Sequence, residues 1–507
     1  MSETEYGLKR SLGLGALVAV EIGLIIGAGI FVLVGVAMKE TGPSVPIAFL
    51  VAAVPIMLVM LSLAMIGSAV PCAGGTYRYS SRLVSPGWAW LGVWGYLIGM
   101  VFGAFPLYAL RAAEYFSKAF PGLDPGNWPW FMSIYRAAMT VLPQATPMEF
   151  LIQAGAAAIL TFFFAFNVKG VQFAGMVQGI MVVVLLAALI YFVVAGVPHV
   201  KTENLSPLFP KGAAGLFLAS AILTLALLGA NGVIELGAEI KNPGRNIPLS
   251  LAISVPSVAV LYVLIGVIAV GVAPWDSMKG TLLSEQAKLV LSSAGMKMFF
   301  IGGAFLAITT SINGLFMCCT KSMLVVTSDR LLPTWLHKVH SKWNTPYRFL
   351  AIIWLLGVVS IFFKVPAGTF ESYASIGGLM IFLPLMIAVI RFPKILPKQY
   401  QSAPFKLKGV WLYLCPGLGM ILSLGAILML FFGELKFFWQ ISFLAMLAAG
   451  EAIYLIQKYR TISQLGDHLQ RNVSADLALW SSLAPDNPMT QEPQPDAACV
   501  KGQAETE

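Results

Sequence analysis

The chain has 507 residues, of which 58% are hydrophobic and 11% are charged. Soluble domains carry about 25% charged residues, so this composition excludes a soluble globular protein and predicts an all-α integral membrane protein. The formal net charge is +9, and the basic residues gather between the apolar stretches. Because cytoplasmic loops of membrane proteins are enriched in Lys and Arg, we interpret this charge as a sign of topology and expect no nucleic-acid partner.

About twelve apolar stretches are long enough to cross a bilayer, since roughly 20 helical residues span its hydrocarbon core. Most of the 32 Lys and Arg residues then fall on one side, which predicts a multi-pass protein of the cell membrane, plasma or inner, with both termini cytoplasmic. Residues 1–11 form the expected cytoplasmic N-terminus, and the polar segment 460–507 is expected to be a flexible cytoplasmic tail. The predicted spans are residues 12–38, 44–70, 87–116, 149–168, 171–196, 215–238, 249–272, 297–325, 349–364, 372–391, 410–433 and 438–457.

The five cysteines do not form the pattern of a disulfide framework. Cys318 and Cys319 are adjacent on one predicted helix, where neighbouring side chains point in different directions. We therefore expect free thiols. No group of His, Cys, Asp and Glu has the spacing of a metal site, so we expect neither a resident metal nor an organic cofactor.

The first apolar stretch has a glycine-rich break in its middle, Ile25-Ile26-Gly27-Ala28-Gly29-Ile30-Phe31. Unpaired backbone N–H and C=O groups are costly in hydrocarbon, so non-helical backbone at membrane depth occurs only where it is buried in protein or lines a cavity. Glycine permits a sharp turn and the close approach of a ligand. The break therefore predicts a binding site.

The sixth stretch has a similar break, Leu225-Ala226-Leu227-Leu228-Gly229-Ala230-Asn231-Gly232, five spans after the first. Glycine-interrupted spans at corresponding places in two halves of a chain indicate a transporter built from inverted repeats, with its substrate near the membrane midplane. The alternative is that these glycines only allow close helix packing. Two breaks in register favour the binding site.

Four motifs follow one another in an order that matches a known family. They are Gly27-Ala28-Gly29-Ile30-Phe31, Pro71-Cys72-Ala73-Gly74-Gly75-Thr76-Tyr77, Ala238-Glu239-Ile240-Lys241-Asn242-Pro243-Gly244-Arg245-Asn246-Ile247-Pro248 and Ser328-Asp329-Arg330-Leu331-Leu332-Pro333. With them the chain resembles the amino acid, polyamine and organocation superfamily, near its L-type and cationic amino acid transporter branch. The resemblance implies two inverted repeats of five helices, residues 12–196 and 215–391, with broken helices 1 and 6, and two further helices within 410–457.

The ends of the broken helices suit a zwitterion. A half-helix that begins near Gly29 directs free N–H groups and the positive end of its dipole toward a carboxylate. Half-helices that end near Ile26 and Leu228 leave free carbonyls for an ammonium group, and the resemblance implies the same arrangement. The predicted substrate-binding residues are Ile25, Ile26, Gly27, Ala28, Gly29, Ile30, Leu225, Ala226, Leu228, Gly229 and Asn231.

The sixth span departs from the family pattern. Leu225, Leu227 and Ala230 stand where relatives often have aromatic residues, so we expect a pocket of altered shape. Asn231 either binds a polar substrate group or makes a hydrogen bond between helices, and both interpretations stay open. By the same resemblance, Ser375 in the tenth span is a further candidate.

A proton is the first candidate for the coupling ion. The lysine that relatives often carry in the fifth helix is absent near Leu185, whereas Glu21 is an unusual carboxylate inside the first span. Glu21 could bind a proton on one side of the membrane and release it on the other. Alternatively, it is a structural partner of a cation such as Lys321.

Sodium is the second candidate for the coupling ion. Carbonyl groups near Ile22 and Gly23 could bind it together with the hydroxyl groups of Thr310 and Ser311, because a hard cation prefers oxygen ligands. The alternative is that these hydroxyl groups bond to backbone carbonyls, as Ser and Thr often do in membrane helices.

These features predict a secondary active transporter that moves a small amino acid or related amine by alternating access, coupled to protons or sodium or acting as an exchanger. The alternative is a membrane receptor that binds the amino acid without moving it. We do not expect an enzyme, because no nucleophile or acid–base pair converges. The expected partners are the substrate and the lipid bilayer, and the sequence specifies no oligomeric state. Arg111 and Glu114 are expected to pair on one helix face.

Overall fold

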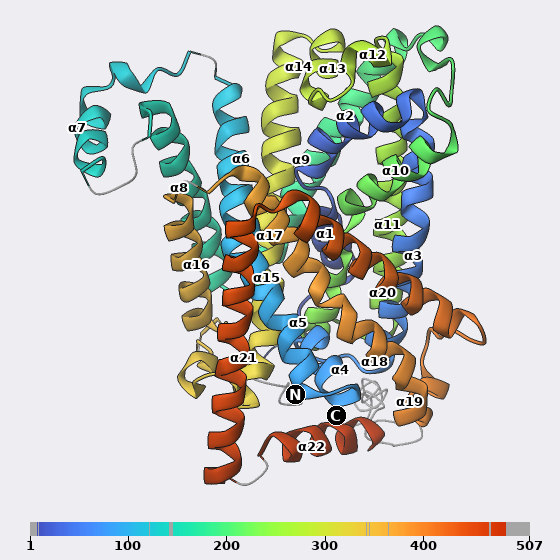
Figure 1. Ribbon diagram of the computed structural model, residues 1–507, viewed down its shortest axis with the longest axis vertical. Coiled ribbons are helices and arrows are strands. Elements are labelled where there is room, and N and C mark those ends of the chain that lie inside the picture. Colours follow the sequence, from blue (N-terminus) through green and yellow to red (C-terminus); the bar gives the residue numbers. More distant parts are fainter. Residues whose placement is uncertain are drawn as a thin grey trace, which may run out of the picture.

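The computed structural model describes residues 8, 10–120, 122–140, 145–340, 342–343, 345–363, 365–465 and 468–482. Every regular element within these residues is a helix. Most of the long helices run roughly along one axis, and α22 (His468–Ser482) lies across one end of the bundle, beside α4 (Gly75–Leu83) (Figure 1). We call this end of the molecule the α22 end.

The first half of the bundle starts with a helix that is broken in its middle. Its two parts are α1 (Leu14–Ile25) and α2 (Gly29–Thr41). Later in this half, α5 (Pro86–Gly99), η3 (Met100–Ala104) and α6 (Phe105–Lys118) form one continuous span through a π-helical turn. The other helices are α3 (Val45–Ala69), α7 (Pro129–Ala138), α8 (Pro147–Val168) and α9 (Val171–Gly196).

The second half also starts with a broken helix. After α10 (Gly212–Thr224) the chain continues in three short 3-10 segments, η7 (Leu225–Leu227), η8 (Ala230–Glu235) and η9 (Gly237–Glu239). The other elements are α11 (Pro243–Gly271), α12 (Trp275–Met278), α13 (Leu283–Val290), α14 (Ser293–Met298), η10 (Phe299–Phe305), α15 (Leu306–Ser328), α16 (Tyr347–Ile361), α17 (Ala367–Met380), α18 (Phe382–Ile395), α19 (Pro397–Ser402), α20 (Trp411–Met429), η12 (Leu430–Glu434) and α21 (Phe437–Leu465).

The described residues include nine helices that are long and apolar enough to cross a membrane and three shorter apolar helices, α1, α10 and α16. One of the nine, Gly29–Ala69, joins α2 and α3, so all twelve predicted spans are represented. Outer helices expose large apolar side chains, for example Val183 at 68% and Phe432 at 71%. Such surfaces face lipid, and the expectation of an all-α, multi-pass membrane protein is confirmed.

The two broken helices run in opposite directions. Lys211, just before α10, donates from its ammonium group to the carbonyl of Lys39 near the end of α2. At the other end, the N–H of Lys241 donates to the carbonyl of Leu12 just before α1, at 2.9 Å. The second broken helix therefore starts where the first one ends, which is the antiparallel relation that an inverted repeat requires.

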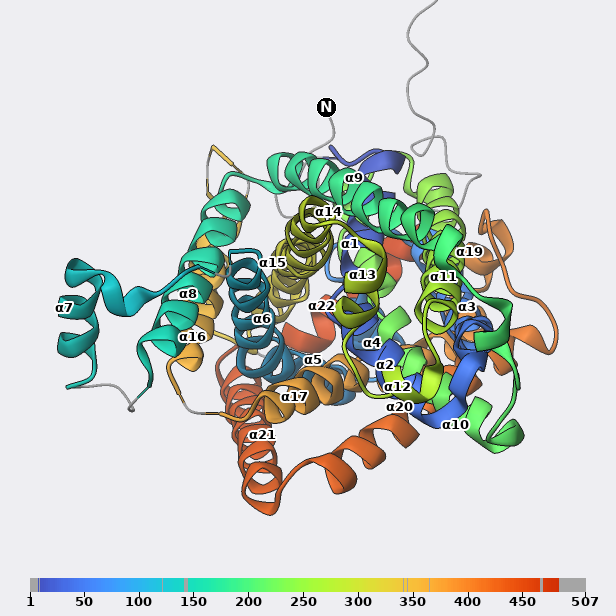
Figure 2. The same ribbon diagram turned by 90° about the horizontal axis from the view of Figure 1, so that it is seen from above.

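The helices pack in two groups. In the broken-helix group, α3 packs on α10 and α11, α2 packs on α10, and α1 packs on η8 and α11. The α15 group contains α5, α6, α8, α15 and α16, and both α1 and η8 also pack on α15 across the two groups. Viewed along the long axis, α1, α2 and α15 lie inside, while α8, α16, α9 and α21 lie at the periphery (Figure 2). Because α4 packs on α5 and α15, it belongs with the α15 group.

The chain after residue 460 differs from the expected flexible tail. Helix α21 continues to Leu465, and α22 then docks on α4. Trp480 of α22 is 2% exposed, and its ring lies 6.0 Å from that of Tyr79 in a tilted arrangement. The carboxylate of Asp476 accepts hydrogen bonds from both Arg78 and Arg82. Overall polarity concealed this short amphipathic helix. The residues after 482 lie outside the described part of the chain.

Candidate functional site

The first break is short and its backbone is only partly paired. Helix α1 ends with the N–H of Ile26 bonded to the carbonyl of Ile22, and α2 begins at Gly29 after a single turn. The hydroxyl group of Tyr262, on α11, lies 3.4 Å from the carbonyl oxygen of Ile25 and 3.4 Å from that of Ala226. The carbonyl groups of Ile25 and Ala226, one from each broken helix, therefore meet at one tyrosine.

Glycines let the two broken helices touch backbone to backbone. Gly229 has φ +130°, a conformation that other residues rarely adopt, and a Cβ atom there would lie 2.4 Å from the carbonyl oxygen of Leu24. In the reverse direction, a Cβ on Gly29 would lie 3.3 Å from the Cα of Ala226. The glycine of each break thus packs against the other broken helix.

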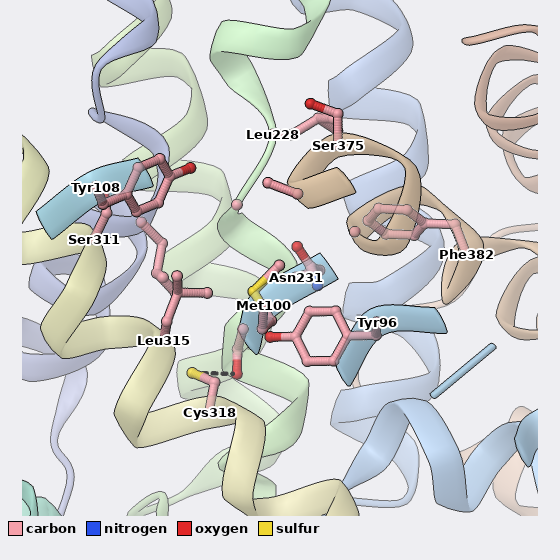
Figure 3. A pocket seen from close by; sticks show the side chains of 15 residues that line it. Tyr96, Met100, Tyr108, Leu228, Asn231, Ser311, Leu315, Cys318, Ser375 and Phe382 are labelled. Carbon is pink, nitrogen blue, oxygen red and sulfur yellow. Dashed lines mark hydrogen bonds between the residues drawn. The ribbon is translucent and has the colours of Figure 1, made fainter. Parts of the chain in front are cut away.

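A cavity of about 150 Å³ opens beside these contacts. Asn231 lies in its centre, with Tyr96 and Phe382 on one side and Tyr108 and Leu315 on the other (Figure 3). The segments around it are the end of α1, the second break, the third span, α15 and α17–α18. The lining residues are Leu24, Tyr96, Met100, Tyr108, Leu228, Gly229, Asn231, Gly232, Ser311, Leu315, Cys318, Ala374, Ser375, Gly378 and Phe382.

The lining is neutral. Its polar groups are an amide, hydroxyl groups and a thiol, and none of the residues that line the cavity is acidic or basic. A zwitterion in this space would find its charge complements in backbone groups, that is, in the free N–H and C=O groups at the helix ends. The side chain of such a ligand would meet mainly Leu, Met, Phe and Tyr.

The structure divides the predicted substrate residues into two sets. Leu228, Gly229 and Asn231 line the cavity, as do the weaker candidate Ser375 and the coupling candidate Ser311. The other set does not line the cavity. Its isoleucines and Ala226 are buried, Gly27, Ala28 and Gly29 are partly exposed, and the side chain of Leu225 lies outside the described part. That set is Ile25, Ile26, Gly27, Ala28, Gly29, Ile30, Leu225 and Ala226.

Several cavity residues carry no sequence signal that would single them out. Tyr96, Met100 and Tyr108 come from the third span and Phe382 from the tenth, where an apolar or aromatic residue is indistinguishable from a packing residue. Tyr262 is equally inconspicuous. Only the folded arrangement turns these side chains toward the two breaks.

Both hydroxyl groups proposed for sodium already donate hydrogen bonds to backbone carbonyls. Ser311 Oγ donates to the carbonyl of Gly23 at 2.9 Å, and Thr310 Oγ1 donates to the carbonyl of Ala307 at 2.8 Å. Gln178 of α9 fills the remaining gap, because a Cβ on Gly23 would lie 2.1 Å from its Nε2 atom. That amide donates to the carbonyl of Thr310 and accepts from Asn313. A hydrogen-bond donor therefore stands between the first span and α15.

Glu21 is fully buried, but it does not pair with Lys321. Its carboxylate accepts hydrogen bonds from Ser250, at 2.8 Å, and from Ser254, both on α11. Lys321 instead forms an ion pair with Glu239 at 2.7 Å. The predicted structural partner of Glu21 is thus replaced by two hydroxyl groups.

Other local predictions are confirmed. Arg111 Nη1 lies 2.8 Å from Glu114 Oε2 on the same helix face. Cys72, Cys318, Cys319 and Cys415 are buried free thiols, while Cys499 lies outside the described residues.

Comparison with known proteins decides the family. The model of the family described as "Amino acid permease" matches residues 12–450. The chain belongs to this family. The resemblance drawn from the four motifs, and the expectation of a transporter and not an enzyme, are confirmed.

Relatives of this amino acid permease cover between 76% and 91% of its length. It is similar to the branched-chain amino acid permease BcaP of Bacillus subtilis, with 30% identity over 91% of this chain and 96% of the relative. A methylthioribose transporter of the same organism is 28% identical over 89% and 93%. The vacuolar cationic amino acid transporter 4 of Arabidopsis thaliana is 27% identical over 76% of this chain and 63% of the relative.

Proposed function

We propose that the chain carries a neutral amino acid with a small or medium-sized apolar side chain across the membrane by alternating access. The cavity between the two broken helices carries this proposal. Free peptide groups beside it suit the carboxylate and ammonium groups of the substrate, and Leu24, Leu228, Leu315, Met100 and Phe382 surround the space left for its side chain.

The relatives suggest three substrate classes, and the lining favours one of them. A cationic side chain would need a carboxylate partner, because burying an unpaired charge is costly, and no lining residue is acidic. A sugar such as methylthioribose would need many convergent polar groups. Branched-chain and similar neutral amino acids fit the neutral, largely apolar lining best.

We also propose that the α22 end is cytoplasmic. The described N-terminal residue Leu8 packs against Ala73 and Leu324 there, and α22 docks on the same side. Basic residues concentrated at this end support the assignment. The substrate would then enter from the opposite end and leave toward α22.

Transport is proposed to be independent of sodium. The oxygens of Gly23, Thr310 and Ser311 are engaged in hydrogen bonds, and the amide of Gln178 places N–H groups where a cation would need oxygen ligands. A proton is the remaining coupling ion of the two considered.

Counterflow in proteoliposomes tests these proposals together. Vesicles loaded with unlabelled leucine should take up labelled leucine, isoleucine or valine, whereas lysine and methylthioribose should not compete. Replacing sodium by choline should leave the rate unchanged. Binding of leucine without any counterflow would favour a receptor and contradict the transport proposal.

A further inference from the structure

Glu235 is a second buried carboxylate, and it lies directly beneath the cavity. Its residue is 3% exposed. On the cavity side, Cys318 Sγ lies 3.4 Å from the carbonyl oxygen of Gly232, and both residues line the cavity. One turn further toward the α22 end, the next pair along the same two segments is Ser322 and Glu235, at 2.8 Å.

Two hydroxyl groups hold this carboxylate. Ser322 Oγ donates to Oε2, Thr76 Oγ1 donates to Oε1, and the two hydroxyl oxygens lie 2.9 Å apart. The ion pairs among the described residues do not include Glu235. A charged carboxylate without a cation is costly in such a site, so its state of protonation depends strongly on whether water reaches it.

The charged groups on the surrounding elements are engaged elsewhere. On α15, Lys321 pairs with Glu239; on α4, Arg82 pairs with Asp329 and Asp476. On α1, Glu21 faces the serines of α11. The other titratable groups on the elements packed against η8, or close to Glu235, are Cys72, Tyr77, Arg78, Tyr79, Tyr96, Arg245, Tyr262, Cys318 and Cys319.

Glu235 differs from Glu21 in what it joins. Glu21 connects α1 to α11, two helices of the broken-helix group that pack on each other. Glu235 connects η8 of the broken-helix group to Thr76 of α4 and Ser322 of α15, both in the α15 group. If one group rocks against the other during transport, the surroundings of Glu235 must change, whereas those of Glu21 need not.

We infer that Glu235 carries the coupling proton and that its contacts with Thr76 and Ser322 form the inner gate. The inference rests on the proposed transport function. A proton from the side opposite α22 binds the carboxylate while these contacts are closed, giving a neutral acid that is cheaper to bury. Separation of the two groups admits water, which stabilises the carboxylate, and the proton leaves toward the α22 end.

Proton binding and the conformational change are thermodynamically linked. A proton shifts a conformational equilibrium only if it binds the two conformations with different affinity. Burial between hydroxyl groups favours the protonated form, and hydration favours the charged form. Release of the proton therefore favours opening of the α22 end, and opening favours release of the proton.

The test compares E235Q with E21Q in proteoliposomes of the full chain. Counterflow of labelled leucine reports substrate exchange, and leucine accumulation driven by an inward proton gradient reports coupling. E235Q, which resembles the neutral acid and favours the closed contacts, should show slower but measurable counterflow that does not depend on pH, and it should lose proton-driven accumulation. E21Q should keep both accumulation and pH dependence. E235D, which keeps a carboxylate, should restore part of the pH dependence, and size-exclusion profiles check folding.

Four other outcomes would each contradict either the role of Glu235 or the proposed transport function. Proton-driven accumulation by E235Q at the wild-type level overturns the role of Glu235. Loss of pH dependence in E21Q with retention in E235Q assigns the proton to Glu21 instead. Wild-type counterflow that never responds to protons overturns this inference and leaves the proposed function intact. Absence of wild-type counterflow overturns the proposed function itself.

Discussion

The two breaks have the same place in the two halves but a different construction. In the first, only Ile26, Gly27 and Ala28 separate two regular α-helices. In the second, regular helix stops at Thr224, and 3-10 segments continue to Glu239. The first break contributes mainly backbone, whereas the second also places polar side chains, Asn231 in the cavity and Glu235 beneath it.

This difference indicates that the two breaks have different roles in transport. A 3-10 segment has poorer hydrogen-bond geometry than an α-helix and often marks a hinge. The first break, held between α-helices, is suited to a fixed position for the substrate's charged groups. The second is suited to movement, because its stretch from Leu225 to Glu239 lacks the regular ladder that would resist bending.

The largest effect should come from Gly229→Ala. A methyl group at φ +130° is strained and would lie 2.4 Å from the carbonyl oxygen of Leu24, which is backbone and cannot swing away. We expect leucine counterflow to fall by at least about 100-fold, as an enforced separation of the two helix ends costs several kcal/mol. Gly179→Ala is the control, since its Cβ meets nothing within 4 Å; equal activity of both variants would contradict the interlocked breaks.

Gly29→Ala should have a smaller effect. Its Cβ would lie 3.3 Å from the Cα and Cβ of Ala226, a contact that a shift of a few tenths of an ångström relieves. We expect counterflow to fall about tenfold, corresponding to about 1.4 kcal/mol, while Gly29→Leu should abolish it. Gly27→Ala should reduce counterflow less than Gly29→Ala does, because its Cβ meets only the rotatable hydroxyl group of Ser311. A greater loss for Gly27→Ala than for Gly29→Ala would reverse the proposed order.

Tyr262→Phe tests whether one hydroxyl group links the two breaks. The hydroxyl lies 3.4 Å from each of the carbonyls of Ile25 and Ala226, long enough for each bond to be weak. Its removal should raise the KM for leucine about two- to tenfold, as expected for about 0.5–1.5 kcal/mol of hydrogen bonding, with the maximal rate changed less. A change confined to the maximal rate would place Tyr262 in the conformational step and not in the site.

The existence of both breaks could be predicted from sequence, because glycine is conspicuous in an apolar span. The extent of the second break could not, since Val233, Ile234 and Leu236 look helical. The reason lies in tertiary contacts: the N–H of Gly74 donates to the carbonyl of Glu235 at 3.0 Å, and Gly237 packs against the backbone of Cys72. These contacts replace the helical ladder with partners distant in the chain.

The partners of individual side chains also depend on tertiary contacts that the sequence does not show. Glu21 was recognisable, because a carboxylate in a span is rare, but its serine partners on α11 were not, as Ser250 and Ser254 belong to another span. Gln178 carries no comparable signal, because only the packing of α9 shows that this side chain lies toward Gly23. The sequence therefore marks candidate functional groups, whereas their hydrogen-bond partners depend on the fold.

The smallest effect on transport is expected from Asp476→Asn, far from both breaks. Burial disfavours ionisation of Asp476, but its bonds to Arg78 and its proximity to Arg82 outweigh burial and lower its pKa. The carboxylate therefore stabilises α22 docking at pH values above its ordinary pKa, and this contribution disappears as the pH falls through the lowered value.

Removing the charge of Asp476 should weaken α22 docking by about 1–2 kcal/mol, after allowance for partial exposure. Tryptic cleavage at Arg471 should then accelerate about tenfold, while leucine counterflow stays within about twofold. Asp276→Asn is the matched control, because its pair with Lys279 is exposed and lies at the opposite end. If cleavage is unchanged, Trp480 packing alone holds α22; if counterflow instead collapses, α22 acts on the gate at Glu235, and the breaks are not the only elements that control access.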